Sequence, residues 1–260
     1  MPTVTLLAKI YDKFQLKLVD KFLKSMLKGL KVEIKICGVT PRGWTQIAVS
    51  GEDEKVALRY LSEEIGLCPA RLENVEKFTT IKSRIVAMDK SKGELCVDIG
   101  VFSPKAIDAA IPLQRLQGQL IDGRKVALNK LVELFGFCEN LPLTVKILNI
   151  DKDKNHVEAM LSERQLTQYK NWTKSLLDRL IILGSSIYDV RLTLKKADLD
   201  RDILNIETLG LFELAVTCKL GTDAAGLIPK IGKNLRNATF TIFNPKKVLE
   251  FLDYSHAFIS

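Results

Sequence analysis

The stretch LTVKILNIDKDKNHVEAMLS, residues 143–162, decides the fold of this chain. On both sides of the charged turn at 151–155, apolar side chains occupy every second position. Such alternation is typical of a strand that buries one face, and a polar turn between two such strands predicts an antiparallel hairpin. The chain is therefore expected to contain a β-rich unit that ends near residue 162.

A second hairpin lies upstream of the first. Residues 81–102, IKSRIVAMDKSKGELCVDIGVF, show a similar alternation around a polar turn at 89–93. A short apolar segment at 109–113 and a helical insertion at 123–138 separate the two hairpins. We therefore predict a five-element β unit over residues 78–162.

The two hairpins resemble the opening and closing strand pairs of an S1-type RNA-binding domain, which is an OB-fold barrel. In that family a strand of the form V-K-V-L-x-I-D leads through a polar turn to a strand that ends in L-S, and residues 145–162 are similar. Residues 111–116, IPLQRL, stand where the short third strand of the family lies. The resemblance covers about a third of the chain and implies a closed β-barrel that binds RNA.

The chain departs from the S1 pattern at positions where the family binds bases. OB barrels hold single strands by stacking bases on exposed aromatic side chains over a basic groove. Cys96 stands where an aromatic residue is often found, Pro112 where histidine is frequent, and Phe102 is the one aromatic left in a suitable loop. We therefore expect weak base stacking and, instead, contacts to phosphates or to RNA shape.

The whole chain also resembles an archaeal family, domain of unknown function 2110, which has this S1-like core. The resemblance is strongest in LFELAVTCKLGTDAAGLIPKIGKNL, residues 211–235, and in FNPKKVLEFL, residues 243–252. It implies an archaeal, cytoplasmic protein.

The N-terminal unit, residues 1–77, follows the order strand, helix, strand, strand, helix, which resembles the start of a ferredoxin-like α/β sandwich. The first helix is expected at 12–29, and a short last strand is expected near 71–78. The opening residues lack the basic lead and the cleavage site of a secretory signal, so we expect them to form a strand.

The residues SERQ at 162–165 fit a capping box, so a connecting helix of about 20 residues is expected over 163–185. The C-terminal unit, 186–260, is expected to be a small α/β domain, which makes the whole chain an α+β multidomain protein. Its predicted elements are a strand at 190–194, a helix at 199–209, a strand at 211–220, a helix at 224–235, a strand at 238–243 and a last helix beginning at Pro245.

The net charge of +8 and the pI near 9.1 favour an anionic partner. The basic excess is largest over residues 77–150, which hold eleven lysines and arginines against seven acidic residues. These side chains form either an anion-binding face or a solvated rim that aids solubility. Together with Phe102, the candidate RNA contacts here are Lys82, Arg84, Lys105, Arg115, Arg124, Lys125 and Lys130.

The helix expected at 12–29 places lysines at spacings of three and four residues. At about 100° per residue they fall within an arc of about 80°. This stripe is either a phosphate-binding surface, which would relieve the repulsion among like charges, or the ordinary outer face of a surface helix. No bulky aromatic flank favours a peripheral membrane role. The stripe consists of Lys13, Lys17, Lys21, Lys24, Lys28 and Lys31.

A third basic group lies in the C-terminal unit. Residues 226–234 superficially resemble a phosphate loop, but the spacing is one residue too long and Asn234 replaces the Ser or Thr that holds magnesium. Lys230, Lys233 and Arg236 are expected along one edge of the 224–235 helix, as a further phosphate contact.

Motifs for other chemistries are missing from the sequence. The five cysteines are scattered without a CxxC pair, and only His156 and His256 could add nitrogen ligands, so we expect reduced thiols in a cytoplasmic protein and no zinc site. The acids Asp198, Asp200 and Asp202 are interpreted as a polar helix start, and no metal or cofactor is expected. The absence of a GxSxG motif and the two widely separated histidines argue against nucleophilic catalysis, and the absence of a long apolar window argues against a membrane span.

Three hypotheses for function follow from these patterns. The first is a non-enzymatic RNA-binding protein associated with the ribosome or with another translation or RNA-processing particle, with RNA and ribosomal proteins as partners. The second is a protein-interaction adaptor, in which the barrel docks on another protein. The third is an enzyme whose site lies in the C-terminal unit.

Overall fold

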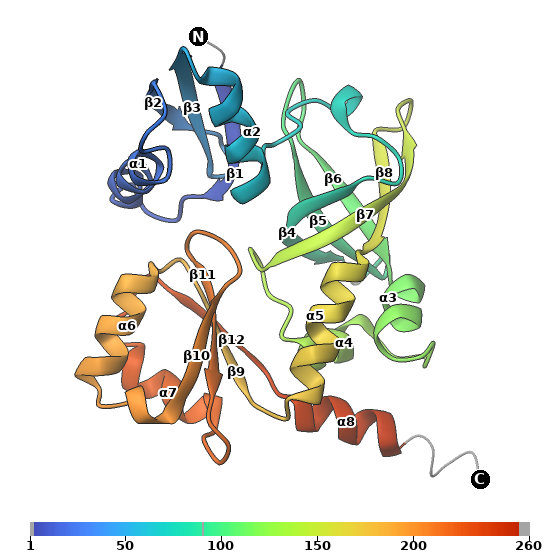
Figure 1. Cartoon of the computed structure of the whole chain (residues 1–260). Helices are drawn as coiled ribbons and strands as arrows, with labels where there is room; N and C mark the ends of the chain where they lie inside the picture. The colour runs from blue at the N-terminus through green and yellow to red at the C-terminus, as the bar shows by residue number, and fades with distance from the viewer. Residues whose placement is uncertain (1–2, 90, 255–260) are drawn as a thin grey trace.

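Two open sheets and one closed barrel, surrounded by eight α-helices, make up the described part of the chain in this computed structural model, so the protein has a mixed α+β fold (Figure 1). The structure describes residues 3–89 and 91–254. Lys90, in the predicted 89–93 turn, and His256 lie outside the described residues.

The N-terminal sheet has the strand order β1-β3-β2, with β1 (Thr3–Lys9), β2 (Val32–Val39) and β3 (Trp44–Gly51) all antiparallel. Helices α1 (Gln15–Met26) and α2 (Glu54–Glu64) share one hydrophobic core with this sheet. Val19 and Leu23 of α1 and Leu61 of α2 are fully buried in that core, as the helical spacing of apolar residues requires.

The last strand predicted near 71–78 is wrong, because a single 3₁₀ turn, Leu72–Asn74, forms there. The free edge of β1 is instead paired by residues 66–68. Leu7 N donates to Gly66 O at 2.9 Å and Cys68 N donates to Thr5 O at 2.8 Å. Pro69 follows and has no N–H to extend the ladder, so the pairing stops there.

The central barrel is closed, with the strand order β4-β5-β6-β8-β7, and its strands are β4 (Thr80–Asp89), β5 (Glu94–Val101), β6 (Ile107–Pro112), β7 (Pro142–Asp151) and β8 (His156–Leu161). Both predicted hairpins are confirmed as β4–β5 and β7–β8. Within the barrel, β6 and β8 pair in parallel, and the other neighbouring strands pair antiparallel. The insertion predicted at 123–138 contains helix α4 (Leu128–Phe135). A helix that was not predicted, α3 (Leu113–Leu120), precedes it, so residues 113–116 are helical and do not continue the third strand.

Helix α5 (Glu163–Lys174) begins as predicted, since the Ser162 side chain accepts a hydrogen bond from Gln165 N. The prediction that this helix continues to about residue 184 is wrong. It ends at Lys174, and residues Arg179–Leu183 form strand β9.

The C-terminal sheet has the order β10-β11-β9-β12 and is antiparallel throughout, with β10 (Ile203–Thr208), β11 (Glu213–Cys218) and β12 (Thr239–Phe243). Its helices are α6 (Ile187–Lys196), α7 (Ala224–Ile231) and α8 (Pro245–Tyr254). The predicted strand at 190–194 is therefore part of a helix. The predicted helix at 199–209 is replaced by a 3₁₀ turn, Asp200–Asp202, and by β10.

The barrel and the C-terminal sheet share one core. Leu180 and Ile182 of β9 pack in the cluster that includes α6 and α7, whereas Ile181 and Leu183 pack in the cluster that includes the barrel and α5. An aromatic group from α4, α5 and β12 fills the junction, and within it the rings of Tyr169 and Trp172 are 5.6 Å apart. Among the described residues, no helix is long and apolar enough to cross a membrane.

Candidate nucleic-acid interface

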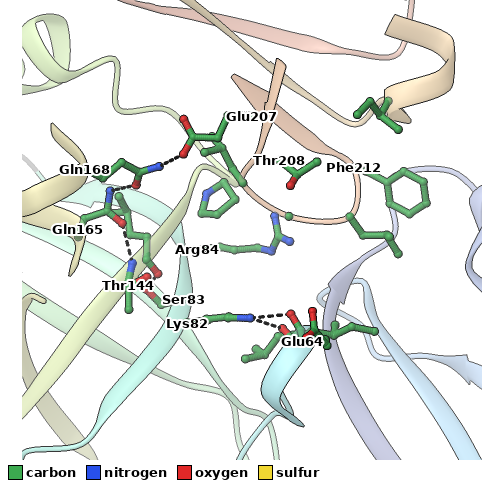
Figure 2. A pocket seen from close by; sticks show the side chains of 18 of the residues that line it. Glu64, Lys82, Ser83, Arg84, Thr144, Gln165, Gln168, Glu207, Thr208 and Phe212 are labelled. Carbon is green, nitrogen blue, oxygen red and sulfur yellow. Dashed lines mark hydrogen bonds between the residues drawn. The ribbon is translucent and has the colours of Figure 1, made fainter. Parts of the chain in front are cut away.

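A cleft of about 970 Å³ opens where the three sheets meet. Strands β4 and β7 and helix α5 line it from the barrel side, α1 and the end of α2 line it from the N-terminal unit, and the β10–β11 loop and the start of α6 line it from the C-terminal unit. Figure 2 shows side chains from these elements converging around Lys82 and Arg84.

Lys82 projects from β4 into this cleft and is half-buried. Its Nζ donates to the carbonyl oxygens of Glu64, at 3.0 Å, and Ile65, at 3.1 Å, at the C-terminal end of α2. Burial lowers the pKa of Lys82, and the positive charge of Arg164 lowers it further. The ammonium group is therefore held by neutral oxygens and lies near a second cation.

Arg164 is an exposed residue in the first turn of α5 and lines the same cleft. Among the described residues, neither Lys82 nor Arg164 has an ion pair with a carboxylate. The sequence prediction included Lys82 but missed Arg164, which it treated only as part of a helix cap. Arg164 could have been predicted from its position in the sequence, because it comes directly after the last barrel strand, β8.

A chain of amide and carboxylate hydrogen bonds crosses the wall of the cleft behind these cations (Figure 2). Gln165 accepts from Thr144 N at 2.9 Å and donates to Gln168 at 3.0 Å, and Gln168 donates to Glu207 at 2.9 Å. Trp172 Nε1 donates to the other oxygen of Glu207 at 3.2 Å. Helix α5, which holds Arg164, is thus fixed to both the barrel and the C-terminal sheet.

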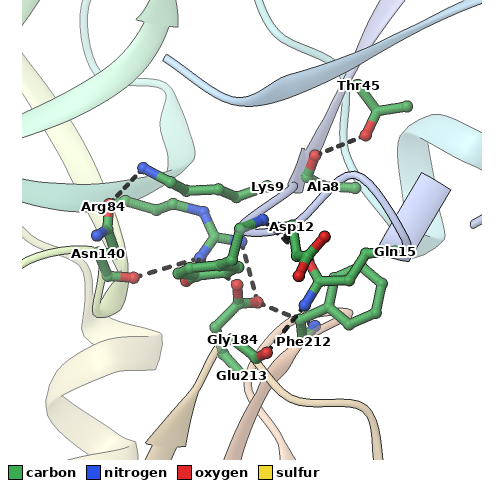
Figure 3. A network of polar contacts seen from close by, with 11 residues as sticks. Ala8, Lys9, Asp12, Gln15, Thr45, Arg84, Asn140, Gly184, Phe212 and Glu213 are labelled. Atoms are coloured by element: carbon green, nitrogen blue, oxygen red, sulfur yellow. Dashed lines mark hydrogen bonds and ion pairs between the residues drawn. The ribbon is translucent and has the colours of Figure 1, made fainter. Parts of the chain in front are cut away.

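Arg84 points away from solvent, and only 5% of its side chain is exposed. It forms an ion pair with Glu213 of β11, with N–O distances of 2.7 and 3.0 Å (Figure 3). Its guanidinium lies 5.1 Å from the centre of the Trp44 ring. Burial, followed by the charge of Glu213, raises the pKa of the neighbouring Tyr11. The structure therefore places Arg84 in a junction between the units, where it offers no surface contact to phosphate.

Further polar contacts join the N-terminal unit to its neighbours. Gln15 Nε2 donates to Gly184 O at 2.8 Å, and Trp44 Nε1 donates to Asp98 of β5 at 2.9 Å (Figure 3 shows the first). Arg42 forms ion pairs with Asp98 and Asp108. The outer face of β5 and β6 is therefore in contact with the N-terminal unit at these two acids.

The remaining predicted residues of the barrel region do not line the cleft. Phe102 is half-buried. Arg115 is 3.6 Å from Glu158, Lys130 is 3.1 Å from Glu133, and Arg124 donates to Phe251 O at 2.9 Å. Lys105 and Lys125 are exposed.

The predicted lysine stripe is exposed on and around α1, but the helix is shorter than expected. Lys24 pairs with Asp20 at 2.7 Å, and Lys31 pairs with Glu52 at 2.7 Å. Lys13, Lys17, Lys21 and Lys28 have no ion pair with a described residue.

The expectation that no bulky aromatic residue flanks this stripe is wrong. Phe14 is 77% exposed and Phe22 is 41% exposed, both beside the lysines of α1. Helical periodicity alone could have shown this, because positions 14, 18 and 22 fall between the lysine arc and the buried arc.

The third predicted group is also exposed, but only Lys230 lies on α7, while Lys233 and Arg236 follow the end of the helix. Figure 1 shows α7 well apart from α1 and from α3. Within the described residues, no three His, Cys, Asp or Glu side chains come together in a way that could hold a metal ion.

Comparison with solved structures and curated proteins gives little further detail. No curated protein matches the chain. A chain in the crystal structure of the a/eIF2alpha–aDim2p–rRNA complex from Pyrococcus horikoshii OT3 is 13% identical, with a TM-score of 0.26. The match covers 48% of this chain and 65% of that chain, which is less than two thirds of its length.

Family models match most of the chain in three consecutive segments. The DUF2110 N-terminal domain matches residues 3–70, the DUF2110 central domain matches 75–173, and the DUF2110 C-terminal domain matches 177–243. The chain therefore belongs to the DUF2110 family.

Proposed function

We propose that this protein binds RNA without catalysing a reaction, and that it holds phosphates in the cleft between its three sheets. The observation that favours this proposal most is the pair Lys82 and Arg164. Both line one cleft, each has no carboxylate ion pair among the described residues, and their charges repel each other. A phosphate between them would relieve that repulsion and accept charge-assisted hydrogen bonds from both.

The barrel supports this proposal as a scaffold. Its closed order β4-β5-β6-β8-β7 is consistent with an S1-like OB barrel, and the order β1-β3-β2 with its two helices is consistent with a ferredoxin-like unit. OB barrels bind oligonucleotides through their second and third strands. Here Arg42 and Trp44 contact the acids on that face, so we assign the RNA contact to β4, β7 and α5.

The exposed lysines of α1 extend the basic surface from the mouth of the cleft. Leu18 and Phe22 of α1 line the cleft, and Lys17 and Lys21 lie on the neighbouring side of the same helix. Phosphates that follow a strand out of the cleft would meet these lysines. We propose that the RNA belongs to the ribosome or to another translation or RNA-processing particle in the cytoplasm.

The test compares Arg164→Glu with Lys170→Glu. Both residues are exposed on α5 and both changes shift the net charge equally, but Lys170 does not line the cleft. Affinity for a labelled RNA, measured by fluorescence anisotropy at several salt concentrations, should fall at least about tenfold more for Arg164→Glu. Removing one phosphate from the bound surface should reduce the salt slope by about 0.7.

Equal losses for the two variants would show that only net charge attracts RNA. Failure of the unmodified protein to bind RNA at low salt would overturn the proposal. Co-sedimentation with ribosomal subunits that survives nuclease treatment would instead favour a protein adaptor.

A further inference from the structure

Helix α1 exposes a row of apolar side chains between its lysines and its buried face. Phe14, Leu18 and Phe22 are 77%, 42% and 41% exposed, whereas Val19 and Leu23 are fully buried. Residues four apart lie one above another on a helix, so the three side chains form a continuous line. Packing against the N-terminal sheet does not account for this line, because the buried face lies on the other side of it.

The row borders the cleft. Leu18 and Phe22 line it, and Tyr188, in the first turn of α6, lines it from the C-terminal unit with 71% of its surface exposed. Figure 1 shows α1 and α6 on the same side of the molecule. Aromatic rings from two separate units are thus exposed around one opening.

The positively charged side chains near these rings indicate which class of ligand the surface fits. Lys17 and Lys21 lie beside the row on α1, and Arg164 lines the cleft from α5. Proteins that bind single-stranded nucleic acid combine basic side chains that follow the backbone with aromatic rings that stack on bases. A duplex hides the faces of its bases, and a flat lipid surface does not follow the walls of a cleft that is lined from three units.

We infer that Phe22 and Tyr188 stack on unpaired bases of single-stranded RNA whose phosphates are held by the lysines of α1 and by Arg164. This inference rests on the RNA binding proposed above and names its ligand class. It also changes the expectation from the sequence that base stacking is weak. The stacking rings lie outside the barrel, on helices that the S1 pattern does not include.

The experiment compares three ligands of similar length: a single-stranded oligoadenylate, the same strand in a duplex, and inorganic polyphosphate, which has charge but no bases. The variants are Phe22→Ala, Phe22→Leu and Tyr188→Ala. The matched control is Tyr60→Ala, because Tyr60 is 39% exposed on α2 and does not line the cleft. Phe22→Leu retains apolar bulk without a ring, so it separates loss of stacking from loss of folding.

We expect the single strand to bind more tightly than the duplex. Each of Phe22→Ala, Phe22→Leu and Tyr188→Ala should weaken single-strand binding at least about fivefold, and polyphosphate binding should not change. A strand that contains 2-aminopurine should show quenching on binding that Phe22→Leu reduces. Tyr60→Ala should match the unmodified protein in every assay.

Equal binding of single strand and duplex, with no effect of the ring variants, would overturn this inference while RNA binding itself would stand. Loss of all RNA binding at low salt would overturn both proposals. Two further results would also overturn it: tight binding to anionic lipid vesicles that Phe22→Ala abolishes, or a dimer that Phe22→Ala converts to a monomer.

Discussion

Arg84 and Glu213 form a charged pair enclosed between the barrel and the C-terminal sheet. Their side chains are 5% and 0% exposed, and Trp44 and Tyr11 close the site from the N-terminal unit. A buried ion of this kind is tolerated only while its partner is present. Through its contacts with Glu213, Trp44 and Tyr11, Arg84 therefore links the barrel to the C-terminal sheet and to the N-terminal unit.

Replacing Glu213 with alanine should leave the Arg84 guanidinium buried without its carboxylate. The expected loss in the free energy of unfolding is about 3–5 kcal/mol, measured by urea denaturation. The double variant Arg84→Met/Glu213→Leu should lose less than Glu213→Ala, because it leaves no unpaired charge. A loss in the double variant as large as that in Glu213→Ala would contradict this account.

At the scale of the element, α1 has three faces with different roles. Its buried face packs on the N-terminal sheet, its apolar row borders the cleft, and its lysines face solvent. Unpaired exposed lysines contribute little to folding, so they can be changed without loss of the helix.

The double variant Lys17→Glu/Lys21→Glu should lower RNA affinity, because phosphates that leave the cleft would no longer meet these two cations. For every phosphate that is no longer bound, the slope of log affinity against log salt should decrease by about 0.7. The control is Lys55→Glu, an exposed lysine on α2 outside the cleft, which should leave the slope unchanged. Titrations at four or more salt concentrations give both slopes. A similar change in slope for Lys55→Glu would mean that the stripe is an ordinary solvated face.

The two barrel hairpins are predictable from the sequence, whereas strand β9 is not. Both barrel hairpins alternate cleanly and are confirmed. Strand β9 is buried on both faces, so its run of apolar residues has no period of two and resembles the end of a helix. Within the cleft, the sequence identifies Lys82, but it does not show that Arg84 is buried, because its partner Glu213 is 129 residues away in sequence.

At the scale of the whole molecule, the shared core joins the barrel to the C-terminal sheet. Ile181 and Leu183 of β9 and Phe243 of β12 pack in the same cluster as the inside of the barrel. Two compact units that share a core are expected to unfold together.

The two tryptophans allow this to be measured. Trp44 lies at the contact between the N-terminal unit and the barrel, and Trp172 lies between α5 and β12. In Trp44→Phe, the fluorescence of Trp172 and the far-ultraviolet circular dichroism should change at the same urea concentration. Separate midpoints would show that the barrel and the C-terminal sheet unfold independently.

The position of β12 also has a consequence for the order in which the protein folds during synthesis. A ribosome releases the barrel strands first, but Phe135 and Tyr169 are covered by Phe243, which emerges about 70 residues or more after them. Until then the nascent chain exposes an aromatic surface beside a finished barrel, the kind of surface that chaperones protect. Phe135 and Tyr169 are therefore covered by Phe243 only after β12 has been synthesised.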